Sequence, residues 1–106
     1  MIRGQLAGVG DHWVVVVSTD SLADVLPTCW ALLATTNPGP LNPPLVVALA
    51  AAAAGDDHPA LWIRTTQIRT VATGALRLIG PVPAHILHQL DQTLTRLLDI
   101  QIDPPR

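Results

Sequence analysis

Residues 61–71 read Leu-Trp-Ile-Arg-Thr-Thr-Gln-Ile-Arg-Thr-Val, and this stretch decides how the rest of the chain is interpreted. Its side chains alternate in the way that is typical of a β-strand with two different faces. The alternation assigns one face to Leu61, Ile63 and Thr65 and the other to Trp62, Arg64 and Thr66. A bulge is expected near Gln67. The stretch therefore predicts a long strand that carries an arginine and a threonine on its polar face.

Shorter strands are expected on both sides of this one. The β-branched run within residues 13–18 suits a buried strand, and further apolar runs predict strands over residues 28–35 and 76–79. Residues 8–11 leave room only for a hairpin turn. The polar group at residues 19–21 is expected to cap a short helical turn over residues 22–26, and a proline- and glycine-rich loop is expected over residues 37–40.

Residues 45–54 are ambiguous on sequence alone. The five alanines at positions 50–54 favour a helix by propensity, whereas Pro43-Pro44 and the pair Val46-Val47 favour a strand. We expect a strand that frays into a turn over residues 55–59. The last part of the chain has a different period, with leucine and isoleucine recurring every three or four residues. It predicts a helix from Pro83 to Asp99.

Size and composition set the class of protein. A chain of 106 residues is expected to form one domain over residues 1–102, with a loose tail at residues 103–106. Phenylalanine and tyrosine are absent, so the core must be aliphatic. The single cysteine, Cys29, excludes an internal disulfide and is expected to be a buried, inert thiol. The expected class is α+β, an antiparallel sheet with a terminal helix.

Charge and hydropathy limit the partners. A formal net charge of −2 gives no general attraction to nucleic acid, so any such contact must depend on a local cluster of basic groups. No signal peptide is visible, and the longest apolar stretch, residues 45–54, is about half a membrane span. We therefore expect a cytoplasmic protein that does not enter a membrane.

Several segments, in the right order, resemble the MazF/PemK/Kid toxins of the CcdB/PemK-like superfamily. The segments are Met1-Ile2-Arg3-Gly4-Gln5, Val14-Val15-Val16-Val17-Ser18-Thr19-Asp20, Thr66-Gln67-Ile68-Arg69-Thr70-Val71, Leu78-Ile79-Gly80 and the leucine-rich helix. The resemblance implies a small SH3-like antiparallel β-barrel with a C-terminal helix. It also implies a homodimeric toxin of a type II toxin–antitoxin system, inhibited by a MazE-like antitoxin peptide. Such a toxin cleaves single-stranded RNA by 2′-OH attack, with no metal or cofactor and no action on DNA.

The resemblance also assigns candidate catalytic residues. Arg64 takes the place of an arginine that acts as acid and charge stabiliser, a role that suits its fixed charge and its bidentate geometry. His12 stands where relatives carry an arginine before their second strand, and its ordinary titration range would suit a general base. Thr35 is the first choice for the threonine that contacts the scissile phosphate, with Thr36 as the alternative.

Five further residues are candidates for RNA contact: Arg3, Thr36, Thr66, Gln67 and Arg69. Thr66 stands where many relatives carry an acidic residue, and a hydroxyl without a neighbouring base cannot replace that residue as general base. For Gln67 and Arg69 a structural role at the dimer contact is the preferred interpretation. His85 and His88 have a spacing seen in metal sites, but without a third ligand they are interpreted as surface residues.

Two alternatives keep the fold and discard the nuclease. One is a CcdB-like protein that acts on gyrase, although the Trp-Gly-Ile ending of those toxins is not found in Ile102-Asp103-Pro104-Pro105-Arg106. The other is a catalytically degenerate relative that binds RNA, an antitoxin or another protein without cleaving RNA.

Overall fold

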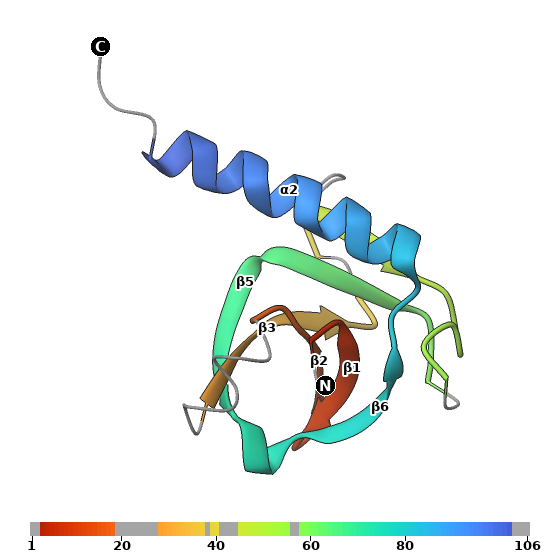
Figure 1. Ribbon diagram of the computed structural model, residues 1–106. Coiled ribbons are helices and arrows are strands. Elements are labelled where there is room, and N and C mark those ends of the chain that lie inside the picture. The colour runs from red at the N-terminus through yellow and green to blue at the C-terminus, as the bar shows by residue number, and fades with distance from the viewer. Residues whose placement is uncertain (1–2, 19–27, 38, 41–44, 56–57, 103–106) are drawn as a thin grey trace.

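The architecture is a curled antiparallel sheet with one long helix lying across it (Figure 1). The computed structural model describes residues 3–18, 28–37, 39–40, 45–55 and 58–102. The strands are β1 (Gln5–Val9), β2 (His12–Val16), β3 (Thr28–Thr35), β4 (Val46–Leu49), β5 (Leu61–Ala72) and β6 (Arg77–Pro81). A 3₁₀ turn, η1 (Thr73–Ala75), and a helix, α2 (Ala84–Ile102), complete the described elements. The expected turn over residues 22–26 and the tail at 103–106 lie outside the described residues.

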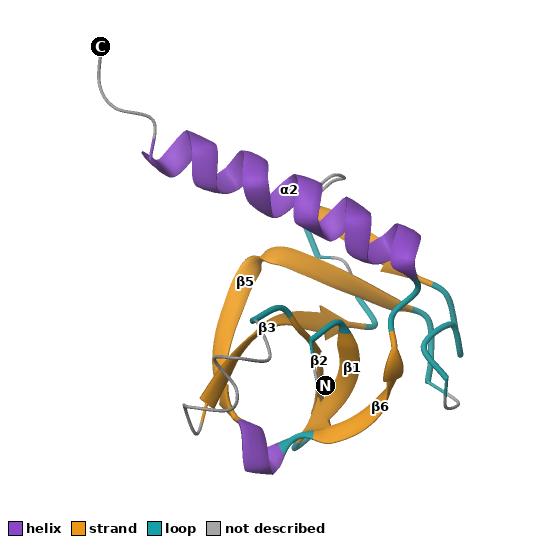
Figure 2. Cartoon of the chain, viewed as in Figure 1, coloured by secondary structure: helices purple, strands orange, loops and turns teal. Residues whose placement is uncertain are grey.

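The six strands follow the order β4-β5-β3-β2-β1-β6, and every neighbouring pair is antiparallel. The sheet curls into a half-barrel, which is visible as the open ring of strands in Figure 2. This arrangement confirms the predicted α+β class and the barrel with a C-terminal helix. Strands β4 and β6 form the two edges of the sheet.

Both faces of the central strands are buried, which explains why β2 is an unbroken valine run. One face belongs to the larger core, in which Val15 and Leu32 are fully buried and α2 contributes Ile86 and Leu90. The other face packs against a small cluster of Ala7, Val14 and Ala31. Because both faces avoid water, a strand of this kind needs no polar alternation. The expected aliphatic core is therefore confirmed.

Strand β5 bends sharply halfway along its length (Figure 1). Its pairing with β3 is regular except at one point, where β3 contributes only Leu33 and β5 contributes residues 64–67. The extra residues lie where a bulge was expected, near Gln67. Before the bend, Leu61, Ile63 and Thr65 are buried and the alternate residues face outward, as predicted. The bend turns the second half of β5 towards η1 and β6.

Two sequence expectations require correction. Residues 5–9 form a full strand, β1, where only a short link to the hairpin was expected; the turn itself is reduced to Gly10 and Asp11. Gly10 has a φ of +57°, which a type II′ hairpin turn requires at its first loop position. The expected strand over residues 45–54 ends at Leu49, and the alanines that follow form a turn in which Ala52 has a φ of +58°.

This alanine turn is held by a buried histidine. His58 Nε2 accepts a hydrogen bond from the Ala54 N–H (3.1 Å), and its Nδ1 donates to the Pro59 carbonyl (2.8 Å). The backbone of Ala52 also donates to the His58 carbonyl at 3.0 Å. These bonds satisfy backbone N–H groups of the turn, so contacts with His58 override the helix propensity of alanine.

Helix α2 runs from Ala84 to Ile102, three residues beyond the predicted end. Pro83 stands immediately before it, as expected for a residue suited to a helix start. Ile86 and Leu90 are buried, and Leu87 and Leu94 pack against the core, so the predicted apolar face is confirmed. Among the described residues, no helix is both long enough and apolar enough to span a membrane.

Candidate functional site

The register of four strands aligns one row of residues across the outer face of the sheet. Thr35 on β3 pairs with Trp62 on β5, and Trp62 pairs in turn with Ala48 on β4. Trp13 pairs with Ala34, so His12 lies one step further along β2, beside Thr35. Residues opposite one another in a sheet project their side chains to the same face. None of the four side chains in this row is fully buried.

Arg64 joins this row from the next outward position of β5, two residues beyond Trp62. Its Nη2 donates a hydrogen bond to the main-chain carbonyl of Asn37 (2.8 Å), and the hydroxyl of Thr35 donates to the same oxygen. The Asn37 side chain in turn accepts a hydrogen bond from the Gly39 N–H (2.9 Å), which folds the loop back on itself. Arg64 and Thr35 therefore meet at one main-chain carbonyl.

The guanidinium has hydrogen-bonding capacity to spare. Its Nε is buried, and within the described part of the chain no acceptor reaches it. The described residues place no carboxylate in a salt bridge with Arg64; the one that they show joins Arg3 and Asp91. Beyond the bond to Asn37, the guanidinium keeps Nη donors that the described residues do not use. A planar guanidinium of this kind suits the oxygens of a phosphate.

The structure separates the other predicted RNA-contact residues. Thr36 is exposed and follows Thr35 directly, while Thr66 is exposed and Gln67 half-buried in the bent part of β5. Arg69 lies beyond the bend, opposite Ala31.

Arg3 lies apart from this group. Its guanidinium is 3.7 Å from an Asp91 carboxylate oxygen on α2, with both side chains more than half exposed. Of the predicted RNA-contact residues, Thr36 is adjacent in sequence to Thr35 and Asn37, and Thr66 lies two residues after Arg64.

The remaining titratable groups fall outside this site. Cys29 is buried, as expected, and burial raises the pKa of its thiol because the thiolate would lose its hydration. His85 and His88 are both exposed on α2. In the part of the chain that the structure describes, no three histidine, cysteine or acidic side chains gather as a metal site would require.

Two residues of the site were missed by the sequence analysis. Asn37 acts through its carbonyl, which no residue-type argument can find, although an asparagine two residues before a glycine does indicate the observed side-chain-to-backbone turn. Trp62 was assigned to the outer face of its strand but given no role. Its position between Thr35 and Ala48 follows from strand register, which the sequence alone does not determine.

Comparisons with known proteins agree with this fold. The family model of the PemK-like, MazF-like toxins of type II toxin–antitoxin systems matches residues 7–98. No curated protein matches the chain closely enough to count as a relative.

Three solved structures illustrate the likeness. A MazE–MazF crystal structure (Form-I) from Deinococcus radiodurans superposes with a TM-score of 0.75 at 19% identity, covering 92% of this chain and 95% of that one. An endoribonuclease from a mycobacterial species gives 0.74 at 18% identity, covering 92% and 90%. The Mycobacterium tuberculosis toxin MazF-mt6 gives 0.69 at 18% identity, covering 90% and 94%. At these identities the solved structures show the fold alone. The family model spans most of the chain, and the chain therefore belongs to the PemK-like, MazF-like toxins of type II toxin–antitoxin systems.

Proposed function

We propose that this toxin is a metal-independent endoribonuclease that cleaves single-stranded RNA. The observation that carries the proposal is the meeting of Arg64 and Thr35 at the Asn37 carbonyl, beside His12 on the neighbouring strand. These three side chains offer a fixed positive charge, a hydroxyl and an imidazole on one exposed face. Hydrolysis through a metal would need a different set of ligands.

The roles follow from the chemistry of RNA. The ribose 2′-oxygen attacks its own phosphorus while His12 accepts the 2′-OH proton. Arg64 donates hydrogen bonds to the phosphate oxygens as negative charge builds up on them, and the Thr35 hydroxyl does the same when a phosphate oxygen replaces the Asn37 carbonyl as its acceptor. The bond from phosphorus to the 5′-oxygen then breaks, that oxygen takes a proton from solvent water beside Arg64, and the proton held by His12 returns to solvent. The products are a 2′,3′-cyclic phosphate and a 5′-hydroxyl, and DNA is not a substrate because it lacks the 2′-OH.

Partners are part of the same proposal. A MazE-like antitoxin would inhibit this toxin by laying a segment over the Arg64 site, ordering as it binds. The described surface leaves Trp30 and Ile68 more than half exposed, which supports association with a second copy. Both associations are proposed for the cytoplasm.

The test is incubation of the purified protein with a long single-stranded RNA in EDTA, followed by mapping of the new 5′ ends. Discrete cuts with 5′-hydroxyl termini, absent from a DNA substrate of the same sequence, are the expected result. If no cuts form and gyrase complexes stall on supercoiled DNA, the CcdB-like alternative replaces this proposal. If neither occurs, the protein is a non-cleaving relative.

The base is tested by a single substitution. His12→Ala should abolish cleavage without lowering the melting temperature, because His12 is exposed at the start of β2. His88→Ala removes another exposed histidine, from α2, and serves as the matched control. Full activity of His12→Ala would remove His12 from the mechanism.

A further inference from the structure

Strand β4 is at one edge of the sheet, and part of that edge is open. β4 pairs with β5 on one side, and no other described strand lies on its other side. The Thr65 N–H bonds to the Leu45 carbonyl, and hydrogen-bonded pairs in an antiparallel ladder fall on alternate residues. The N–H and C=O groups of Val46 and Ala48 therefore point away from β5. Val46 is buried but Ala48 is exposed, so the open part of the edge, where a further strand could pair, is centred on Ala48.

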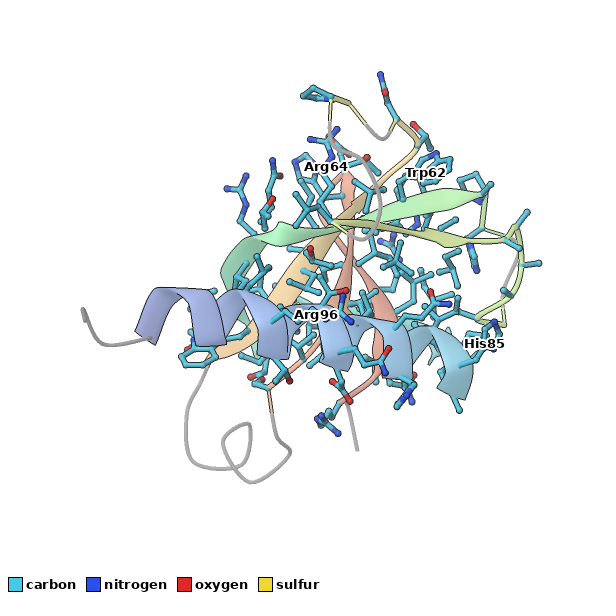
Figure 3. The ribbon with its side chains drawn as sticks, turned by 90° about the horizontal axis from the view of Figure 1, so that it is seen from above. Trp62, Arg64, His85 and Arg96 are labelled. Atoms are coloured by element: carbon cyan, nitrogen blue, oxygen red, sulfur yellow. The ribbon has the colours of Figure 1, made fainter. Side chains whose placement is uncertain are left out.

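A groove lies beside this open edge, between β4 and helix α2. It consists of two adjoining hollows of about 340 and 350 Å³, and Ala48 and Trp62 line both of them. Figure 3 shows Trp62 extending from β5 while His85 and Arg96 extend from α2. The molecule therefore offers pockets for side chains next to a free position for backbone pairing. An open strand edge of this kind is what binds an extended peptide as an added strand, with pockets for its alternate side chains.

The lining of the two hollows is mainly apolar. In the hollow nearer the start of α2, the described lining residues are alanine, leucine, isoleucine and proline, together with Trp62 and His85. The other hollow is apolar on the strand side, where Val46 and Val47 line it, and polar on the helix side. Arg96, on the helix side, is the one residue with a fixed charge among the described residues that line either hollow. Apolar pockets beside a single cation suit a peptide, whereas a polynucleotide would need several cations along its path.

The dimensions of the groove fit a short extended segment. His85 and Arg96, which line different hollows, are about 16 Å apart along the axis of α2. An extended strand covers this distance in about five residues. Val47 and Leu49, the neighbours of Ala48 in β4, pack in the core to which α2 contributes. Because side chains alternate between faces, a residue paired with Ala48 would likewise have both neighbours on the helix side, where the hollows lie.

We infer that the groove is a docking site for an extended segment of a second protein, which adds to β4 as a strand, places apolar side chains in the two hollows and brings a carboxylate to Arg96. The charge supports a carboxylate, because Arg96 is exposed and the described residues place no acidic group in a salt bridge with it. Backbone bonds at Ala48 would supply affinity, and the pockets would select the alternate side chains. The inference goes beyond the proposed function, since Arg64, Thr35 and His12 do not line the groove.

Two other strand donors fit the groove less well. A second copy of this chain would offer its own β4 edge, and Val46–Leu49 carry no acid for Arg96. The C-terminal residues 103–106 include Pro104 and Pro105, which lack the N–H that an added strand needs. The occupant is therefore assigned to a different protein, through a segment that combines apolar and acidic residues.

The binding test uses a synthetic peptide, because peptide binding can be measured whether or not the protein cleaves RNA. The probe is fluorescein-labelled Asp-Thr-Val-Thr-Val-Thr-Asp, in which the valines and both aspartates share one face of a strand. Its anisotropy during titration with the full chain should show saturable binding with a Kd below about 1 mM. Two N-methylated probes, one at the threonine nitrogens and one at the valine nitrogens, test strand addition without altering the protein. Only one of these sets can face β4, so one probe should lose binding and the other should keep most of it.

Two substitutions test the assigned contacts. Ala48→Pro removes the N–H that faces the open edge and leaves the β4–β5 ladder intact, because proline is tolerated where the N–H of an edge strand faces solvent. It should weaken binding about tenfold, and its melting temperature shows whether the fold is retained. Arg96→Gln should weaken binding about threefold, and this loss should disappear when both aspartates of the probe are replaced by asparagine. Arg77→Gln removes the same charge from β6, at the opposite edge of the sheet, and should change neither affinity.

The outcomes distinguish this inference from the proposed function and from other occupants. Binding that is lost with one N-methylated probe and weakened in Ala48→Pro supports the docking site, whether or not the protein cleaves RNA. No saturable binding, or equal binding of the two N-methylated probes, would overturn the docking site and leave the nuclease intact. If Ala48→Pro converts a dimer into a monomer in sedimentation equilibrium, a second copy occupies the edge and the inference is wrong.

Discussion

Replacing Arg64 separates its contribution to catalysis from its contribution to stability. Among the residues that the structure describes, Arg64 makes one hydrogen bond, to the neutral Asn37 carbonyl at 2.8 Å on an exposed part of the structure. Loss of such a bond in Arg64→Ala should lower the free energy of unfolding by about 1 kcal/mol, which corresponds to about 4–8 °C in Tm for a domain of this size. Loss of a charge-stabilising donor should lower kcat by about 10²–10³.

The assay compares three proteins under the same conditions. Cleavage rates of wild type, Arg64→Ala and Arg64→Lys are measured in EDTA, and each protein is melted separately. Lysine keeps the charge but lacks the planar set of donors, so Arg64→Lys should recover stability more fully than activity. A folded Arg64→Ala protein that cleaves RNA at the wild-type rate would refute the role given to this residue. A loss of activity that merely follows the loss of folded protein would refute it equally.

Four further predictions concern the fold and the loop that holds the site. Asn37→Ala retains the carbonyl but loses the bond that folds the loop, so kcat should fall several-fold with little change in Tm; an unchanged kcat would contradict this. Gly80→Ala would place its Cβ 1.8 Å from the Ala54 carbonyl oxygen, so it should lower the free energy of unfolding in urea by about 3 kcal/mol or more. Gly74→Ala is the control, because its Cβ meets nothing within 4 Å and stability should be nearly unchanged. His58→Ala leaves a buried N–H without its acceptor and should cost about 1–3 kcal/mol, and a smaller loss would show that water replaces the ring. Because the thiol pKa of Cys29 is raised in the folded state, the unfolded state loses its proton first, so the free energy of unfolding should decline above about pH 8.5. Cys29→Ala should lack this decline. The same pH dependence of stability in wild type and Cys29→Ala would contradict the raised thiol pKa.

Strands with a clear local signal were predicted well. β3 begins and ends at the predicted residues 28 and 35, and the two faces of β5 follow the predicted alternation up to its bend. These strands carry long apolar or alternating runs, which specify strand and face together. The family could also be identified from sequence, because several of its motifs occur in this chain in the family's order.

Features that depend on particular contacts rather than on the local residue pattern were not predicted. The turn at Ala51–Ala54 depends on the ring of His58, four residues further along the chain, and the β1 strand depends on pairing with both β2 and β6. Position-by-position reasoning gives neither of these interactions.

Part of the candidate site could be predicted from the sequence. Arg64 and Thr35 were named from the resemblance, and the structure brings them to one carbonyl. The functional roles of Arg64, Thr35, His12, Thr36, Thr66, Gln67, Arg69 and Arg3 remain predictions. Asn37 could not be predicted, because a main-chain acceptor carries no signature in its side chain.

The most direct test of the central claim is the chemistry of the RNA ends produced in EDTA by wild type, Arg64→Ala and His12→Ala. The account predicts that the wild type leaves 5′-hydroxyl and 2′,3′-cyclic phosphate termini, and that both variants, still folded, leave the RNA intact. Termini of any other kind, cleavage that requires added metal, or equal cleavage by all three proteins would contradict it.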